Sequence, residues 1–221
     1  MTALSDLVYG KGNKPWPQFI DKYPVKVKQI EGMDNEQLER DIREAGDYLG
    51  GRTAAKCLMT RWAMHTVYKS FVSVSEKAME IANACPLATK TDTNGNPLKV
   101  PLYLNDTWGL VYTTGQSAKV HNHWPSLWSY TYCVSACEEC SPLVFPNAVM
   151  YPKEPLSVTP KTSQIIVFPS WLQHEVPKHN CSHDRIMLSG NLNMDKEIDE
   201  PPLWDTDEYS GSTEGPLWHA S

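Results

Sequence analysis

The sequence has no long hydrophobic run. No stretch of 18 or more uncharged apolar residues occurs among its 221 residues, so we expect no segment that spans a membrane. The first residues lack the basic and apolar segments of a secretory signal peptide. No internal repeat or low-complexity tract occurs either. The composition, with 41% hydrophobic and 21% charged residues, is typical of a globular protein and excludes wholesale disorder.

Positive charge is also scarce. The chain has 20 lysines and arginines against 26 aspartates and glutamates. Eight of these acids lie in residues 195–221 beside a single base, Lys196, so the rest of the chain is close to neutral and gives no evidence of a nucleic-acid partner. Without a secretory signal, the six cysteines are expected to be free thiols in a reducing compartment, the cytoplasm. The sequence does not indicate an oligomeric state.

The N-terminal part of the chain predicts one strand followed by helices. Residues 24–30 alternate apolar and polar side chains, as a half-buried strand does. Asp34 and Gln37 match a capping box for a helix that is expected to end at Gly50 and Gly51. A second helix is expected at about residues 53–68, and a third from about 75 to 85. A turn is expected at residues 94–97.

From about residue 100 the pattern changes to short β-like runs separated by Gly, Pro and Ser. Eight of these runs are expected to be strands: 109–113, 119–123, 128–134, 143–145, 156–158, 164–168, 174–176 and 185–188. Many short, closely spaced strands favour a sandwich, a barrel or a jelly roll. The sequence therefore predicts a mainly β protein of the α+β class, with N-terminal helices packed on a β core.

Histidines suggest a metal centre in this β region. His121 and His123 are two residues apart on a strand-like run, so both side chains point to one face. His174 follows from a distant strand, which is how cupin and jelly-roll folds assemble a metal site. Imidazole ligands suit Fe, Zn, Cu and Ni, and three ligands leave positions open for other molecules. The other four histidines, His65, His179, His183 and His219, are interpreted as surface or hydrogen-bonded residues.

Arg185 opens an apolar strand and needs a partner there, because a buried guanidinium must be paired. One interpretation is a structural carboxylate, either Asp184 or Glu175. The other is the carboxylate of a bound dicarboxylic acid, which a guanidinium can hold through two parallel hydrogen bonds.

Several of these segments together resemble a family of Fe(II)/2-oxoglutarate-dependent oxygenases found in marine bacteria and their phages. The family pattern is a glycine, an HxH, a serine-rich strand with a tyrosine, an FPSW-type turn before a distal histidine, and an arginine that opens a strand ending in asparagine. The resemblance covers about residues 108–193 and rests on these stretches: Gly115–Ser126, Ser129, Tyr132, Val167–His174, Arg185 and Ser189–Asn191.

The resemblance implies a double-stranded β-helix of the jelly-roll, cupin-like type and an iron centre at His121 and His174. The HxH spacing adds His123 as the third ligand. It implies that Arg185 binds 2-oxoglutarate, assisted by Ser189 or Tyr112, and that Tyr132 lines the pocket. Dioxygen would be the other cosubstrate, and an unidentified substrate would be hydroxylated with release of succinate and carbon dioxide. No catalytic residue beyond the metal centre is implied. If the chain is phage-encoded, its compartment is the host cytoplasm.

This reading divides the chain, as a single domain, into an N-terminal strand and helical layer (residues 1–99), a catalytic core (100–194) and an acidic tail (195–221). Two positions depart from the family pattern. His123 stands where most 2-oxoglutarate oxygenases have a carboxylate, and Met187 stands where the family more often has serine. Two alternatives therefore stay open: a three-histidine cupin-type metalloenzyme that does not use 2-oxoglutarate, and a non-catalytic binding protein on the same fold.

The cysteines offer a separate interpretation. Cys133, Cys137 and Cys140 have the C-x3-C-x2-C spacing of the iron–sulfur motif of radical S-adenosylmethionine enzymes. Only 81 residues follow Cys140, too few for the usual barrel, and no glycine-rich cosubstrate motif is present. A zinc site on Cys137 and Cys140 lacks a second CxxC pair. A turn that carries free thiols is the favoured interpretation.

Overall fold

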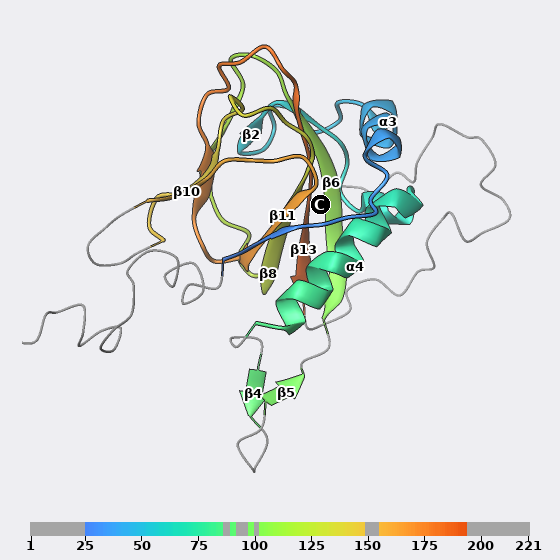
Figure 1. The fold of residues 1–221 in the computed structure, drawn as a ribbon, viewed down its shortest axis with the longest axis vertical. Helices are drawn as coiled ribbons and strands as arrows, with labels where there is room; N and C mark the ends of the chain where they lie inside the picture. Colours follow the sequence, from blue (N-terminus) through green and yellow to red (C-terminus); the bar gives the residue numbers. More distant parts are fainter. Residues whose placement is uncertain (1–24, 86–88, 92–96, 100–101, 149–154, 194–221) are drawn as a thin grey trace, which may run out of the picture.

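The computed structural model describes residues 25–85, 89–91, 97–99, 102–148 and 155–193 (Figure 1). The acidic tail and residues 94–96 of the turn predicted at 94–97 lie outside this part of the chain. The N-terminal elements are β1 (Lys26–Gln29), α3 (Asn35–Ala45), β2 (Ala55–Lys56), β3 (Leu58–Met59), the 3₁₀ turn η1 (Met64–Thr66), α4 (Lys69–Asn83), β4 (Thr89–Thr91) and β5 (Pro97–Lys99). The β core follows with β6 (Tyr103–Tyr112), β7 (Ser117–His121), β8 (Trp128–Ser135), β9 (Leu143–Phe145), β10 (Leu156–Val158), β11 (Gln164–Pro169), β12 (His174–Val176) and β13 (Arg185–Asn193).

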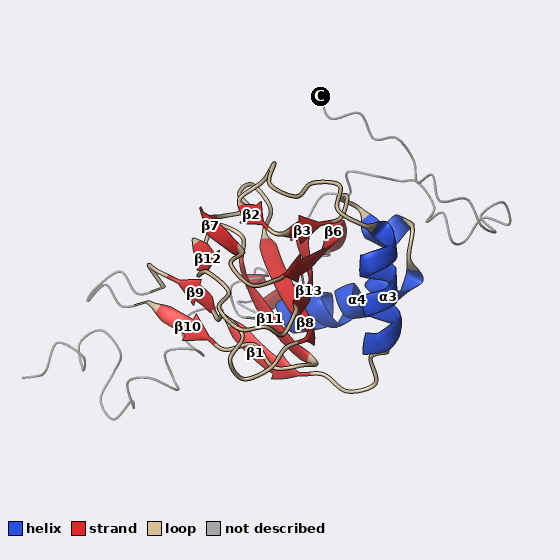
Figure 2. Cartoon of the chain, turned by 90° about the horizontal axis from the view of Figure 1, so that it is seen from above, coloured by secondary structure: helices blue, strands red, loops and turns tan. Residues whose placement is uncertain are grey.

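Two antiparallel sheets form the core. One has six strands in the order β1-β11-β8-β13-β6-β3, and the other has five in the order β10-β9-β12-β7-β2. The helices α3 and α4 lie on one side of the six-stranded sheet, and the five-stranded sheet lies on the other (Figure 2). The jelly-roll prediction is confirmed by this arrangement. None of the helices in the described ranges is long and apolar enough to cross a membrane.

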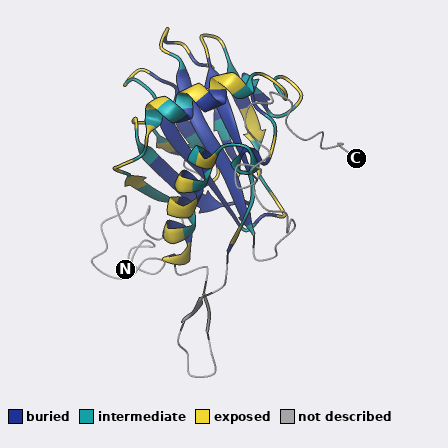
Figure 3. Ribbon diagram, turned by 90° about the vertical axis from the view of Figure 1, so that its right-hand side faces the viewer, coloured by how far each residue is buried: buried dark blue, intermediate teal, exposed yellow. Residues whose placement is uncertain are grey.

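Strand β13 lies at the centre of the six-stranded sheet, between β6 and β8. Its side chains alternate between two apolar clusters. Ile186, Leu188 and Leu192 pack with α3 and α4, whereas Met187 packs in the second cluster, between the sheets. Because both faces of the sheet are covered, all residues of β13 except the last are buried. Figure 3 shows the strands of the core largely in the colour of buried residues. The strand therefore joins the helical layer to the space between the sheets.

The helix predicted after Asp34 is confirmed, but it is shorter than expected. The Asp34 side chain accepts a hydrogen bond from the backbone N–H of Gln37, with 2.9 Å between Oδ1 and N, as an N-cap residue does. The Gln37 side chain does not return to the cap; it donates to Asp41. The helix ends at Ala45, because Gly46 adopts a positive φ of 68°, not at Gly50.

The helix predicted at residues 53–68 is wrong. This segment forms the short edge strands β2 and β3, followed by η1. Ala55, Cys57 and Met59 are all buried. Burial of every second residue is the pattern of a strand and not that of a helix. Strand β2 pairs with β7, and β3 pairs with β6, so backbone pairing with the core outweighs the local helix preference. The third predicted helix is confirmed as α4, which begins earlier, at Lys69.

The contact between α3 and β6 depends on the absence of a side chain at Gly109. A Cβ atom there would lie 2.6 Å from Cγ1 of Ile42. We expect Gly109→Ala to lower the free energy of unfolding by about 1–3 kcal/mol, because it overpacks this contact. In an Ile42→Ala background the same substitution should cost clearly less, since the cavity accommodates the new methyl group. Urea denaturation of the four proteins measures this, and an equal cost in both backgrounds would contradict it.

A buried histidine outside the metal cluster predicts a pH dependence of stability. His65 in η1 is held by Thr107, and burial lowers its pKa to about 4, below the value near 6.5 in an unfolded chain. Between these values only the unfolded state takes up the proton, so stability should fall as the pH decreases from about 6.5 to 4. The His65→Gln variant should lose less stability over this range, by an amount on the order of 2 kcal/mol. Thermal unfolding of the two proteins across this pH range measures the difference. An equal loss of stability in both would refute His65 as the group responsible.

Candidate metal centre and adjoining cavity

Three histidines converge between the two sheets. His121 ends β7 and His174 begins β12, and these two residues are direct partners in the β7–β12 ladder. His123 is held near them because its backbone N–H donates to Ser170 O at 2.8 Å, in the turn between β11 and β12. Ligand nitrogens of the three rings all lie within 4.8 Å of one another. The structure thus brings together the three histidines that the sequence singled out.

The rings are oriented with nitrogen atoms facing a common point. Nδ1 of His121 lies 2.7 Å from Lys119 O, and Nδ1 of His174 lies 3.0 Å from Leu172 O. Carbonyl oxygens only accept, so both Nδ1 atoms carry the proton and both Nε2 atoms have a free lone pair. Nε2 of His123 and His174 are 3.2 Å apart. Two imidazoles that share one ion at about 2.1 Å have nitrogens roughly 3.0–3.4 Å apart, so this distance fits a shared ion.

Burial keeps the three imidazoles neutral. It lowers the pKa of His174 to about 3, with His121 as a smaller cause. The pKa of His123 is well below its usual value because of burial and the two neighbouring histidines. Burial also lowers the pKa of His121, against the effect of the Lys119 carbonyl. Neutral imidazole is the form that binds a metal ion, so near pH 7 the cluster is ready for one.

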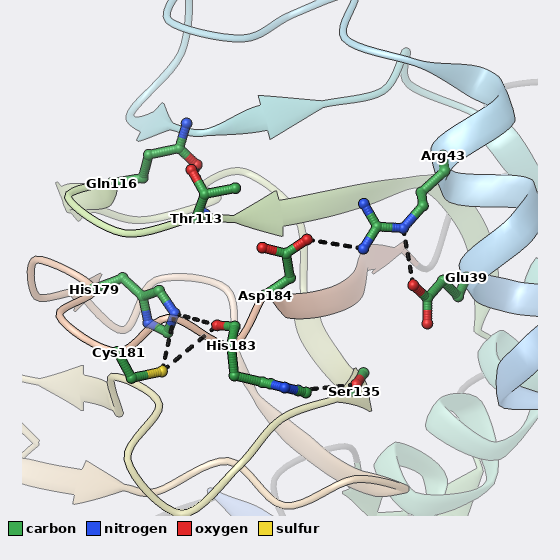
Figure 4. A network of polar contacts seen from close by, with 9 residues as sticks. All are labelled: Glu39, Arg43, Thr113, Gln116, Ser135, His179, Cys181, His183 and Asp184. Carbon is green, nitrogen blue, oxygen red and sulfur yellow. Dashed lines mark hydrogen bonds and ion pairs between the residues drawn. The ribbon is translucent and has the colours of Figure 1, made fainter.

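Arg185 lines the same cavity, which has a volume of about 310 Å³. Its side chain is buried, Nε has no hydrogen-bond partner, and its guanidinium carbon lies 4.9 Å from the centre of the Tyr112 ring. Neither structural carboxylate that the sequence suggested pairs with it. Asp184 binds Arg43 of α3 at 2.9 Å (Figure 4), and among the described residues no carboxylate lies within ion-pair distance of Arg185. The cavity therefore contains a buried cation that lacks an anion.

Of the other residues predicted for the pocket, Tyr112 and Ser189 line this cavity. Burial raises the pKa of Tyr112, so its hydroxyl stays protonated. The Ser189 hydroxyl donates to Thr131 Oγ1 at 3.1 Å. Tyr132 is not among the lining residues; it packs in the helix-facing cluster, and its hydroxyl donates to Asn35 at 2.8 Å. Neighbours on a strand face opposite ways, so Thr131, not Tyr132, points toward the cavity.

Sequence reasoning missed several residues of the cavity wall. Thr131, Trp62, Trp108 and Asn122 all line it. A signal for Thr131 existed, because it pairs with Ser189 in the β8–β13 ladder, but register between distant strands is not readable from one sequence. Trp62 lies in the segment that was predicted to be helical, so its place at the cavity was hidden by that error.

The comparisons with known proteins agree with this geometry. Residues 106–191 match a family model described as "Putative 2OG-Fe(II) oxygenase". The matched span runs from β6 to β13 and contains all three histidines and Arg185. No curated protein matches the chain.

Many solved structures share the fold. The viral collagen prolyl hydroxylase of Paramecium bursaria Chlorella virus-1, in complex with 2OG, is 15% identical, with a TM-score of 0.58 over 78% of this chain and 97% of that chain. A prolyl-4-hydroxylase from Pseudomonas putida is 12% identical, with a TM-score of 0.55 over 80% and 95%. HygX from Streptomyces hygroscopicus, with nickel, 2-oxoglutarate and hygromycin B bound, is 12% identical, with a TM-score of 0.55 over 80% and 85%.

At these identities the solved structures establish the fold alone, and the family model adds a likeness to the family over residues 106–191. The matched span carries the histidine cluster and the buried arginine on the strands that form the cavity. Residues 106–191 therefore resemble the 2OG-Fe(II) oxygenase family, and they carry the histidine cluster and Arg185.

Proposed function

We propose that this protein is an Fe(II)- and 2-oxoglutarate-dependent hydroxylase in which His121, His123 and His174 hold the iron and Arg185 holds the cosubstrate. The observation that carries the proposal is the buried Arg185, whose Nε has no partner in a cavity that the three histidines also line. An uncompensated buried charge is strongly unfavourable. A dicarboxylic acid whose other end reaches the metal removes that cost.

The residues present fit this set of ligands. Fe(II), with 2-oxoglutarate and dioxygen bound, supplies the chemistry that converts the cosubstrate to succinate and carbon dioxide and hydroxylates a substrate. The contribution of the chain is orientation. The carbonyls of Lys119 and Leu172 fix the rings of His121 and His174 through Nδ1, and outer partners of this kind hold both the tautomer and the ring plane of a ligand.

The arginine end of the cavity selects a carboxylate. Arg185 offers a planar set of donors, and the Tyr112 ring packs against it at 4.9 Å. The hydroxyl pair of Ser189 and Thr131 lies on the same face of β13 and β8 and adds neutral donors for the same group. A guanidinium binds a carboxylate through two parallel hydrogen bonds, which gives both affinity and geometry.

His123 in place of a carboxylate changes the charge of the centre. A site with two histidines and one acid carries one positive charge with Fe(II), whereas three neutral histidines leave two. Arg185 adds one more positive charge to the cavity. The site therefore attracts the doubly charged 2-oxoglutarate more strongly than a site with an acidic ligand, which favours cosubstrate binding in spite of the unusual ligand.

The substrate is proposed to bind in an outer groove beside His123. This groove, of about 470 Å³, is lined by Trp62, Trp124 and Asn122, together with amide and carboxylate side chains of β6 and β13. Trp124 is 71% exposed and Trp62 is 42% exposed. Exposed indole rings next to amide groups suit a substrate that combines a flat or apolar face with hydrogen-bonding groups.

The metal ligands can be tested by Fe(II) binding. We expect His121→Ala and His174→Ala each to weaken Fe(II) binding by more than about 100-fold, since each removes a direct ligand. His123→Asp should retain iron, because a carboxylate supplies the ligand of the usual triad, whereas His123→Ala should lose part of the affinity. His65→Gln is the matched control, a histidine outside the cluster. Anaerobic calorimetric titration measures these affinities, and an unchanged affinity in His174→Ala would refute the centre.

The role of Arg185 can be tested by the weak visible absorption band that forms when 2-oxoglutarate chelates Fe(II). We expect this band to require both additions under anaerobic conditions. Arg185→Ala should weaken 2-oxoglutarate binding by about 100-fold or more, because two hydrogen bonds to a charged group are lost. Iron binding should be unchanged in this variant. Arg40→Ala, at an exposed arginine of α3, is the matched control.

Two results would contradict the proposal in different ways. Iron binding without a band in the unmodified protein would favour a three-histidine enzyme that does not use 2-oxoglutarate. A band of equal affinity in Arg185→Ala would keep the cosubstrate but remove Arg185 as its anchor.

A further inference from the structure

A second cluster of possible metal ligands lies away from the histidines. Cys137 and Cys140 lie between β8 and β9, and Cys181 lies between β12 and β13. Their sulfur atoms form a nearly equilateral triangle with sides of 3.6 Å (Cys137 to Cys140), 3.7 Å (Cys137 to Cys181) and 3.7 Å (Cys140 to Cys181). Two loops that are distant in the sequence thus place three thiols together.

These distances discriminate between the possible states of the three cysteines. They are far longer than the roughly 2.05 Å of a disulfide bond. Thiolates that bind one Zn²⁺ at about 2.3 Å in a tetrahedron lie about 3.8 Å apart, which agrees with all three sides of the triangle. In a [4Fe–4S] cluster each thiolate binds a different iron, so the sulfurs lie farther apart than those that share one ion. The triangle therefore fits a single ion and not a cluster.

Cys133 is not part of this triangle. It lies on β8, buried in the apolar cluster between the two sheets. The three cysteines of the C-x3-C-x2-C sequence therefore do not form one site. The third thiol beside Cys137 and Cys140 belongs to Cys181, 41 residues beyond Cys140, and not to Cys133. This also supplies the third ligand that the sequence could not offer to a CxxC pair.

The surroundings hold the thiols in place. Cys140 and Cys181 are buried and Cys137 is partly exposed. The backbone N–H of Cys137 donates to the Cys140 sulfur at 3.3 Å, and the N–H of Cys140 donates to Cys137 O at 3.1 Å, which closes a tight turn. N–H groups directed at sulfur stabilise a thiolate. His179 stands beside Cys181, with Nε2 at 3.4 Å from its sulfur and at 2.7 Å from His183 O (Figure 4).

We propose that Cys137, Cys140 and Cys181 bind one Zn²⁺ ion at a structural site separate from the iron centre. Binding forms three zinc–sulfur bonds, the three thiols release their protons to solvent, and no redox step is involved. Soft thiolate ligands select zinc over the harder cations. Among the described residues no fourth His, Cys, Asp or Glu lies within the same reach, so water completes the tetrahedron on the exposed Cys137 side. His179 positions Cys181 and is not a ligand, because its Nε2 proton is donated to His183 O.

Such a site would fix the segment that leads to Arg185. Cys181 lies four residues before Arg185, and between them Asp184 is held by Arg43 of α3 at 2.9 Å. A metal bound to Cys181 would join this segment to the loop after β8, the strand that carries Thr131. The zinc site would thereby hold β13 and β8 in register at the end where the guanidinium enters the cavity.

The proposal can be tested with Co²⁺, which replaces Zn²⁺ and gives intense thiolate-to-metal absorption in the near ultraviolet. The full chain, reduced and freed of metal, is titrated with Co²⁺ in the His121→Ala/His174→Ala background, so that the histidine centre does not contribute. We expect the band to saturate at one equivalent and to disappear when one equivalent of Zn²⁺ is added. Cys181→Ser should abolish the band, and Cys85→Ser, at a buried cysteine after α4, should leave it unchanged.

Zinc content gives an independent readout. In the same His121→Ala/His174→Ala background the protein should contain about one zinc ion per chain by elemental analysis, and the added Cys181→Ser substitution should lower this to less than about a tenth. Absence of the cobalt band in the reduced, folded protein would overturn the proposal, whatever the stability of the variant. So would zinc content that does not change in Cys181→Ser, or a disulfide between two of the three cysteines found by mass spectrometry of the protein purified under reducing conditions.

Discussion

The rest of the structure depends on the pairing of β13 with β6 on one side and β8 on the other. This central strand is buried on both faces, and its alternation sends Ile186 and Leu188 to the helices and Arg185 and Ser189 to the cavity. A one-residue slip would exchange these sets and place the guanidinium in the helix-facing core. Packing of α3 and α4 on one face thus fixes which side chains reach the cavity on the other.

The cavity combines a cluster of neutral histidines with a buried arginine, and a single anionic ligand accounts for both. The three imidazoles are neutral because they are buried and close together, and Arg185 is the cation of the cavity that lacks an anion among the described residues. A dianionic ligand that bridges metal and guanidinium compensates both positive centres at once. In the proposed centre, His123 in place of an acidic ligand would raise the positive charge of the cavity, which would favour the binding of such a dianion.

The sequence predicted most of the β core, because short apolar runs bounded by Gly and Pro mark strands directly; β9, β10 and β12 have the predicted bounds. The histidine cluster was also predictable from the HxH spacing and the family pattern. The segment at residues 53–68 was not, because β2 and β3 are two-residue strands that exist only through pairing with β7 and β6. For the same reason the sequence favoured Tyr132 over Thr131: strand register is a property of the whole sheet.

The short stretch from β12 to the start of β13 carries one residue of each functional cluster: His174 of the metal centre, Cys181 of the thiol triangle and Arg185 of the cavity. In a single sequence these residues look unrelated, since each finds its partners in a different strand or loop. Antiparallel pairing returns β7, β8 and the loop after β8 to this stretch. The ion pair of Asp184 with Arg43 and the proposed zinc bond of Cys181 would hold the middle of this stretch in place. They would therefore limit where His174 and Arg185, at its two ends, can lie, and so couple the thiol loop to the proposed metal centre.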